Sequence, residues 1–257
     1  MKLTAKTLTA AAVLLVGSVS ANAGVVTVWG ERYNLSTINS FYDGLAGHSS
    51  SIATGELNTV DLSNTDLLWA VQPSNDYTAA ELTAMADFLA GGGRIAFMGE
   101  HGQFAPAENN RINAALAYLG ANITINNLIH DSGFRTASVG DGQILANSLT
   151  AGVTTYEYAA YAPLTISGSA EALMLGEDQP SVMMAYQNVG GGSIFLITDQ
   201  NVWDNSPLWG NSFNNARMFE NLLVADVIDN PVPEPAGLAL ASLALMACFG
   251  VTRRRKQ

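Results

Sequence analysis

Short apolar strands alternate with amphipathic helices along most of the chain, and this alternation restricts the possible fold more than any other feature. Residues 25–29 (VVTVW), 66–71 (DLLWAV) and 94–98 (RIAFM) are nearly continuous apolar runs. Such runs are typical of strands that are buried on both faces of a parallel sheet. Because parallel neighbours need long crossover connections, the segments between these strands are expected to be helices.

Helix signals occur in those segments. Apolar residues recur at helical spacing after residues 78–81 (TAAE), which form a capping box, and Gly91 is expected to end that helix. A third helix is expected to end at Gly120, and a last one to span about residues 214–224. The side chains expected to cap the other helices are Ser36, Asn109 or Asn110, and Asn214 or Asn215.

The middle of the chain is less regular. Residues 126–161 are rich in Gly, Ser, Thr and Asn, which predicts a long insertion with short strands. Strand patterns return at residues 172–175, 182–186 and 193–198, and their close spacing predicts antiparallel pairing near one edge of the sheet. The sequence therefore predicts an α/β domain with a mainly parallel sheet and helices on both faces.

The order of these elements resembles the flavodoxin-like fold of the class I glutamine amidotransferase-like superfamily. Residues 91–102 (GGGRIAFMGEHG) resemble its nucleophile elbow, in which a helix end, a strand and a sharp turn follow one another. The resemblance implies a catalytic cysteine between glycines at that turn. The residues found there are Gly99-Glu100-His101-Gly102, so no thiolate or activated hydroxyl is available for a covalent acyl intermediate. Glutaminase activity therefore cannot be inferred from the fold.

Two glycine triplets, at residues 91–93 and 190–192, precede strands. Phosphate-binding loops follow a strand and open a helix, so that helix amides face the anion. The triplets are interpreted as a helix end and a hairpin turn.

The N-terminal segment has the three parts of a secretory signal in order. Lys2 and Lys6 precede an apolar run at residues 8–19, and Ala21-Asn22-Ala23 is a small-residue cleavage pattern. Signal peptidase is expected to remove residues 1–23, so that the mature chain begins at Gly24. The alternative is a buried first helix.

The C-terminal segment combines Pro233-Glu234-Pro235, an uncharged run at residues 236–251, and a basic end at Arg253, Arg254 and Arg255. The run is shorter than the roughly 20 residues of a typical transmembrane helix, and Arg clusters stay on the cytoplasmic side. These parts resemble the PEP-CTERM sorting signal of Gram-negative bacteria. The resemblance implies a transmembrane-like helix that inserts transiently into the membrane, cleavage by an exosortase, release to the cell surface or extracellular space, and an association with exopolysaccharide. The alternative is a permanent single-pass anchor.

Composition separates these two signals from the body. The predicted division is a signal peptide at 1–23, one α/β domain at 24–229 and a sorting signal at 230–257. Residues 24–233 hold five arginines, no lysine and 21 acidic residues, a net charge of −16, which argues against nucleic acid as a partner. The single cysteine, Cys248, lies in the tail, so the body has no disulfide, thiolate metal site or cysteine nucleophile.

Ligands of open α/β sheets bind outside the carboxyl ends of the strands. The candidate ligand-binding residues at those ends, which could hold a cation or orient a sugar, are Glu100, His101, Asp199, Asn201 and Trp203. Glu100 and Asp199 form the candidate calcium site, Arg32 is a candidate partner for their charge, and His130 and Asp131 could approach from the insertion. The alternative is that Glu100 and Asp199 only cap the turns that follow them.

Two functions are consistent with these features. The first is an exported, non-catalytic surface or matrix protein on an amidotransferase-like scaffold. The second is an extracellular hydrolase of the glycosidase kind that uses Glu100 and Asp199 as paired carboxylates, which requires the two groups to face a shared cleft.

Overall fold

The computed structural model describes residues 24–32, 34–177, 181–203 and 212–225. The expected signal peptide, the apolar C-terminal run and the sorting residues Pro233, Glu234, Pro235, Arg253, Arg254 and Arg255 lie outside these ranges. None of the helices in the described ranges combines the length and apolar character that a bilayer crossing requires.

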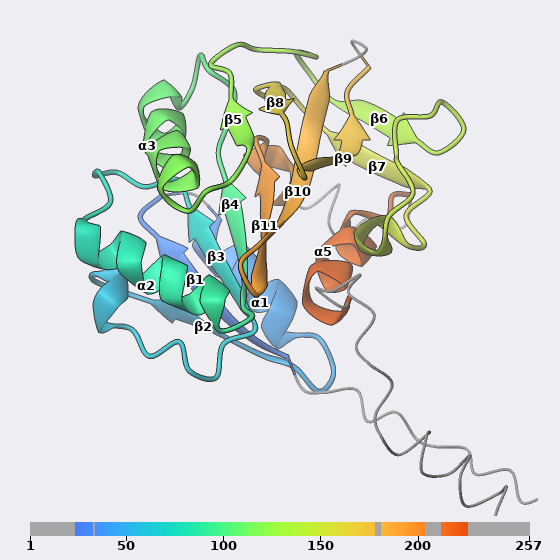
Figure 1. Cartoon of the computed structure of the whole chain (residues 1–257). Coiled ribbons are helices and arrows are strands. Elements are labelled where there is room, and N and C mark those ends of the chain that lie inside the picture. The colour runs from blue at the N-terminus through green and yellow to red at the C-terminus, as the bar shows by residue number, and fades with distance from the viewer. Residues whose placement is uncertain (1–23, 33, 178–180, 204–211, 226–257) are drawn as a thin grey trace, which may run out of the picture.

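Half of the main sheet is parallel (Figure 1). Its strands lie in the order β2-β1-β3-β4-β11, which is the doubly wound order with β11 as the fifth strand. Their bounds are Val25–Gly30 for β1, Ser49–Ala53 for β2, Leu67–Val71 for β3, Arg94–Met98 for β4 and Gly192–Ile197 for β11. The prediction that the runs beginning near residues 25, 66, 94 and 193 share one sheet is confirmed.

The other half of the sheet is antiparallel. β10 pairs with β11, β8 and β9, and β5 pairs with β8. Their bounds are Ile123–Ile125 for β5, Leu164–Ile166 for β8, Glu171–Leu175 for β9 and Val182–Val189 for β10. The expected antiparallel pairing is confirmed. Gly190, with φ of 61°, forms the hairpin turn into β11, as the glycine triplet predicted.

Helices cover both faces of the sheet (Figure 1), as predicted. One face carries α1 (Leu35–Asp43) and α5 (Asn215–Val224), and the other carries α2 (Ala79–Ala90) and α3 (Pro106–Tyr118). Their apolar sides, such as Phe41 of α1 and Leu116 of α3, are buried against strands that are themselves fully buried. This two-sided burial explains why the central strands β3, β4 and β11 are nearly continuous apolar runs.

Two expected helix caps are wrong, and a third is right only in its position. The capping box of Thr78 and Glu81 is present, but α1 begins after Asn34 rather than Ser36. α3 begins at Pro106, because proline is well suited to the first turn, so Asn109 lies inside the helix. Asn214 occupies the N-cap position of α5 without a side-chain cap bond.

The insertion at residues 126–161 is ordered around a small sheet, as expected. β6 (Arg135–Ser138) pairs antiparallel with β7 (Thr155–Tyr158), and Ser148–Thr150 form a short 3-10 helix. The Asn214 side chain accepts hydrogen bonds from the main chain of Thr154 and Thr155, at 3.0 and 3.2 Å. Asn214 therefore attaches the insertion to α5, and this explains why its side chain does not cap the helix.

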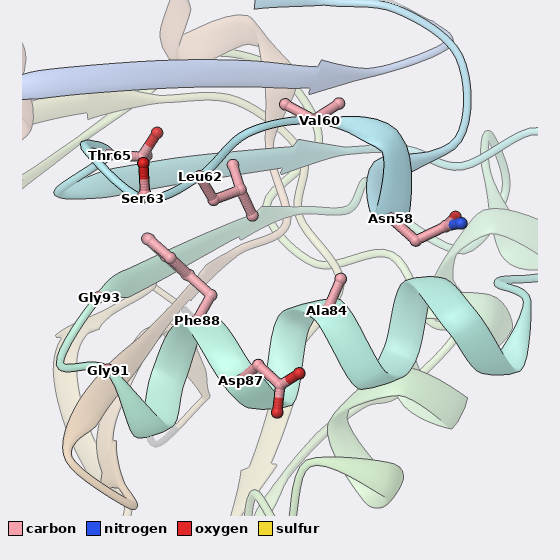
Figure 2. Close-up of a pocket in the computed structure, with 10 residues that line it drawn as sticks. All are labelled: Asn58, Val60, Leu62, Ser63, Thr65, Ala84, Asp87, Phe88, Gly91 and Gly93. Atoms are coloured by element: carbon pink, nitrogen blue, oxygen red, sulfur yellow. The ribbon is translucent and has the colours of Figure 1, made fainter.

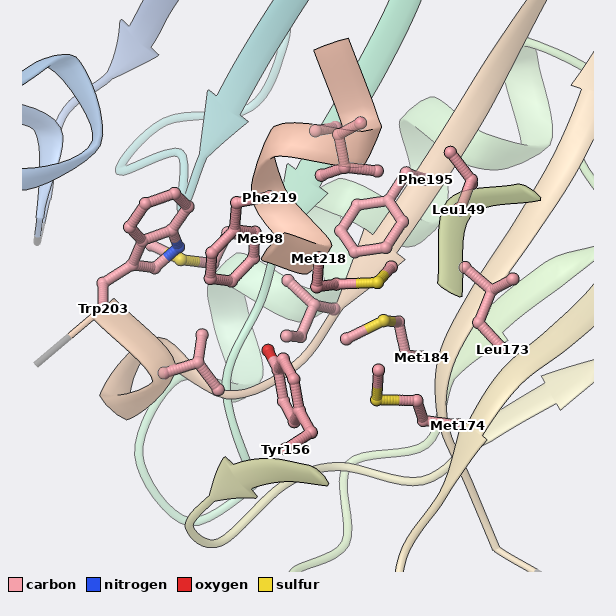
Figure 3. Packing of buried hydrophobic residues seen from close by; sticks show 14 of the residues in the cluster. Met98, Leu149, Tyr156, Leu173, Met174, Met184, Phe195, Trp203, Met218 and Phe219 are labelled. Atoms are coloured by element: carbon pink, nitrogen blue, oxygen red, sulfur yellow. The ribbon is translucent and has the colours of Figure 1, made fainter. Parts of the chain in front are cut away.

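Methionine and aromatic side chains fill the core beneath α5 (Figure 3). Met174 and Met184 are partners across β9 and β10, and Met218 reaches them from α5. Flexible thioethers fill irregular gaps well, which suits a position where a sheet, an insertion and a helix meet.

Candidate functional site

The carboxyl ends of β4 and β11 bring the two predicted carboxylates to the same edge of the sheet. Met98 is aligned with Ile197, and the Gly99 amide donates to the Ile197 carbonyl at 2.9 Å. Glu100 lies two residues after Met98, and Asp199 lies two residues after Ile197. Their placement on neighbouring strand ends agrees with the sequence.

Glu100 connects two turns. Its Oε1 accepts the His101 amide at 2.7 Å and its Oε2 accepts the Gln200 amide at 3.1 Å. The Asn109 side chain, from inside α3, accepts the Glu100 amide at 3.1 Å and donates to the Glu100 carbonyl at 2.6 Å. Glu100 is 1% exposed, so its carboxylate is a buried acceptor for main-chain groups that would otherwise be unpaired.

Asp199 has an equivalent role on the next strand. Its Oδ2 accepts the Ala159 amide at 2.6 Å and its Oδ1 accepts the Asn201 amide at 2.8 Å, and the residue is 0% exposed. The first bond holds the insertion against the sheet, and the second is a side-chain turn. Burial, and then the charge of Asp199, raise the pKa of Tyr156 well above its ordinary value.

These contacts favour the turn-capping interpretation of both carboxylates. A glycosidase acid, base or nucleophile has to reach the substrate, whereas each oxygen here accepts a main-chain N–H inside the protein. Nor do the described ranges contain three or more His, Cys, Asp or Glu side chains grouped to hold a metal ion. In this part of the chain the expected calcium site at Glu100 and Asp199 therefore has no third side chain of these types beside it.

The position of Trp203 differs from the expectation, and Arg32 has a partner on α3. Arg32, expected as a charge partner for the two carboxylates, forms an ion pair with Glu108 in the first turn of α3. Trp203 was expected to face a sugar, but it is almost fully buried and stacks on Phe219 with ring centroids 4.0 Å apart (Figure 3). Its ring belongs to the core because the 3-10 helix at residues 200–203 turns it beneath α5.

His130 and Asp131 connect the insertion to the antiparallel half of the sheet. Nδ1 of His130 lies 2.8 Å from Oγ of Ser181, and Asp131 Oδ2 accepts the Tyr158 hydroxyl and the Glu177 amide, both at 2.7 Å. The observed contacts of His130 and Asp131 are therefore with Ser181, Tyr158 and Glu177, and they hold the insertion in place.

Accessible side chains at this edge come from the turn between β4 and α3. Phe104 is 42% exposed, and its ring centroid lies 6.0 Å from that of His101. The Gly102 amide donates to the carbonyl of Leu128 at 2.8 Å, which brings a second exposed apolar side chain to the same turn. We name His101, Phe104 and Leu128 the elbow patch.

His101 is the polar member of the elbow patch. Its Nδ1 is buried without a hydrogen-bond partner, and burial lowers the pKa of this histidine. Sequence reasoning identified His101 but missed Phe104 and Leu128. The sequence did contain a signal for Phe104, because it is the only large apolar residue in the mostly polar stretch at residues 99–105.

A groove of about 380 Å³ lies at the opposite end of the sheet (Figure 2). Val60, Leu62 and Phe88 form its apolar side, between α2 and the segment that leads into β3. A Cβ on Gly93 would lie 2.3 Å from the Phe88 ring, so this glycine permits close packing after the helix. The first glycine triplet thus forms a helix end, as predicted, and it lies away from the carboxyl ends of the strands.

Comparison with known proteins identifies the tail. Residues 231–256 match the family model described as the PEP-CTERM protein-sorting motif. The chain carries a PEP-CTERM sorting motif. This motif supports export through the membrane to the cell surface or extracellular space, with processing by an exosortase, as expected. No curated protein matches the chain.

Solved structures are similar in fold to the body of this chain. The mmIFT52 N-terminal domain has a TM-score of 0.62 at 18% identity, over 77% of this chain and 94% of that one. The cytoplasmic protein STM1381 from Salmonella typhimurium LT2 has a TM-score of 0.59 at 13% identity, over 79% of this chain and 100% of that one. A β-galactosidase from Rahnella sp. R3 has a TM-score of 0.51 at 15% identity, over 83% of this chain and 33% of that one.

Identities this low show a shared fold and nothing about activity. The likeness to part of a β-galactosidase therefore does not favour the hydrolase alternative. The comparisons show a mixed α/β architecture, and they do not show the glutamine amidotransferase-like superfamily that the sequence resembles.

Proposed function

We propose that this protein is a non-catalytic exosortase substrate whose α/β domain binds exopolysaccharide at the cell surface through the elbow patch. The PEP-CTERM motif at residues 231–256 is the observation that carries the proposal, because it connects the chain to surface sorting. The finer proposal of an amidotransferase-like scaffold is supported by the 2-1-3-4-5 order of the parallel strands and by the glycine-flanked turn after β4.

A binding role is supported by the chemistry of the elbow patch. The exposed ring of Phe104 offers an apolar face to the C–H groups of a sugar, and the neighbouring His101 offers a polar group for hydroxyls. A non-catalytic role is supported by the missing cysteine and by the buried, hydrogen-bonded state of Glu100 and Asp199.

Sorting is tested by Glu234→Ala, which changes the motif but leaves the body intact. Export is expected to continue, whereas release from the membrane is expected to fail, as measured by fractionation of cells that contain the exosortase. Normal release of this variant would contradict the sorting proposal. Wild-type protein in cells that lack the exosortase provides the matched reference.

Binding is tested by retention of the exported protein on the producer's own exopolysaccharide. Phe104→Ala is expected to weaken binding about two- to tenfold, the range of one aromatic contact. Tyr118→Ala is the matched control, because Tyr118 is also an exposed aromatic residue, 54% exposed, but lies at the far end of α3 from the elbow patch. Equal loss in both variants would reject the elbow patch. Release of new reducing ends from the polysaccharide would instead support the hydrolase.

A further inference from the structure

Gly24, the expected first residue of the mature chain, has specific hydrogen-bond partners in the fold. It is buried, its amide donates to Nδ1 of His48 at 2.9 Å, and its carbonyl accepts the Ser49 amide at 3.1 Å. The next amide, of Val25, donates to the Asp66 carboxylate at 2.7 Å. A histidine acceptor and a carboxylate thus lie at the point where the body begins.

Glycine at this position leaves little space for a side chain. A Cβ on residue 24 would lie 2.6 Å from Cδ1 of Leu223 and 3.0 Å from Nδ1 of His48. A larger residue would therefore require the Leu223 side chain or the histidine to move. The close packing favours glycine as the residue whose nitrogen faces His48.

We propose that His48 and Asp66 form a binding site for the α-ammonium group that signal-peptide cleavage creates at Gly24. The proposal rests on the export proposed above and on cleavage after Ala23. Hydrolysis of that peptide bond by water leaves a carboxylate on Ala23 and an amine on Gly24, which takes up a proton. The nitrogen that donated one N–H as an amide then carries three N–H groups and a positive charge.

The surroundings suit this charge. Nδ1 of His48 is already an acceptor, and the Asp66 carboxylate supplies the negative charge beside the adjoining amide. The same corner holds the end of α5: Arg94 donates to the carbonyls of Leu222 and Ala225, the latter at 3.1 Å. The end of α5 therefore lies close to the new terminus, with Leu223 beside Gly24.

The composition of the body makes the site directly testable. Residues 24–233 contain no lysine, so the α-amine of Gly24 is the only primary amine of the processed protein. Acylation by an amine-reactive N-hydroxysuccinimide ester needs an accessible, unprotonated amine, and both burial and pairing with Asp66 oppose it. Exported protein is purified, its N-terminus is determined by mass spectrometry, and its acylation rate is measured in the folded state and in urea.

We expect the folded protein to react at least about tenfold more slowly than the unfolded protein, because the Gly24 nitrogen is buried and bonded to His48 while the exposed Asp66 carboxylate adds its charge. Asp66→Asn is expected to raise the folded-state rate, whereas Asp61→Asn, which changes another exposed carboxylate that does not bond to Val25, is expected to leave the protection intact. Equal rates in folded and unfolded wild type would overturn the proposal, and so would full protection in Asp66→Asn.

The cleavage site is tested separately from the amine site. If mass spectrometry places the N-terminus elsewhere, the expected cleavage site is wrong. The acylation rate is then measured on a protein that consists of residues 24–257. It is expressed with an initiator methionine, which the host removes before glycine. Tryptic mapping then distinguishes acylation at Gly24 from acylation at Lys256. Unprotected Gly24 in that protein would reject the amine site itself.

Discussion

Replacing Glu100 with glutamine tests whether the carboxylate edge of the sheet is structural. The substitution keeps the size of the side chain and removes the charge. A glutamine oxygen can accept one of the two main-chain N–H groups, of His101 or Gln200, that the carboxylate now accepts. The amide NH2 then faces the other N–H, and one buried donor loses its acceptor.

The size of the effect follows from that single loss. A hydrogen bond to a charged group contributes about 1.5–3 kcal/mol, and no discount for solvent is needed at a residue that is 1% exposed. Since 1 kcal/mol shifts the Tm of a domain of this size by about 2–4 °C, Glu100→Gln should lower the Tm by about 3–12 °C. Urea unfolding should show the same loss at an unchanged slope.

The control is Asp87→Asn, which removes the charge of an exposed carboxylate on α2 and should leave stability within about 0.5 kcal/mol of wild type. An unchanged or raised stability in Glu100→Gln would refute the reasoning. It would mean that the buried charge is held at a cost to the fold, which is the behaviour of a functional carboxylate.

Three further results are expected. Phe219→Ala removes the ring that stacks on Trp203 and should lower the free energy of unfolding by about 3–5 kcal/mol in urea titrations, and a loss below about 1 kcal/mol would place Trp203 outside the core. Burial raises the pKa of Tyr42 and of Tyr156 above the ordinary value of about 10, so their contribution to stability is present below about pH 10 and lost as the pH rises further. Absorbance at 295 nm should therefore show these tyrosines ionising together with unfolding, and a separate step in folded protein would contradict their burial. Calcium should leave the Tm equal to that in chelator, because the carboxylate oxygens of Glu100 and Asp199 already accept main-chain N–H groups, and a clear increase with calcium would restore a cation site.

The sheet could be predicted from the sequence because strands that are buried on both faces have a recognisable pattern of consecutive apolar residues. The runs that became β1, β3 and β4 are apolar without alternation, and only a strand covered by helices on both faces tolerates that pattern. The neighbouring positions of Glu100 and Asp199 followed from the same reasoning, since carboxyl ends of parallel strands meet at one edge.

Side-chain roles at that edge could not be predicted, because they depend on partners far along the chain. Asn109 has the composition of a helix cap, but its partner is the main chain of Glu100, nine residues earlier, and Pro106 begins the helix before it. Trp203 follows a strand in a polar stretch, which suggests exposure. Its burial depends on Phe219, which approaches only after α5 has packed on the sheet.

The buried Glu100 carboxylate and the exposed elbow patch belong to one turn, but they are expected to affect different properties of the protein. Glu100 should affect stability, and the patch should affect binding. Glu100 holds the His101 amide, and the His101 carbonyl in turn accepts the amides of Phe104 and Ala105, at 2.9 and 3.2 Å. The carboxylate therefore supports the backbone that presents the Phe104 ring. Loss of Glu100 should reduce stability first and binding only through the disturbed turn, whereas loss of the exposed ring should reduce binding and leave the Tm nearly unchanged. A protein that used this edge for catalysis would show the opposite order, with Glu100→Gln abolishing activity in a fold of unaltered stability.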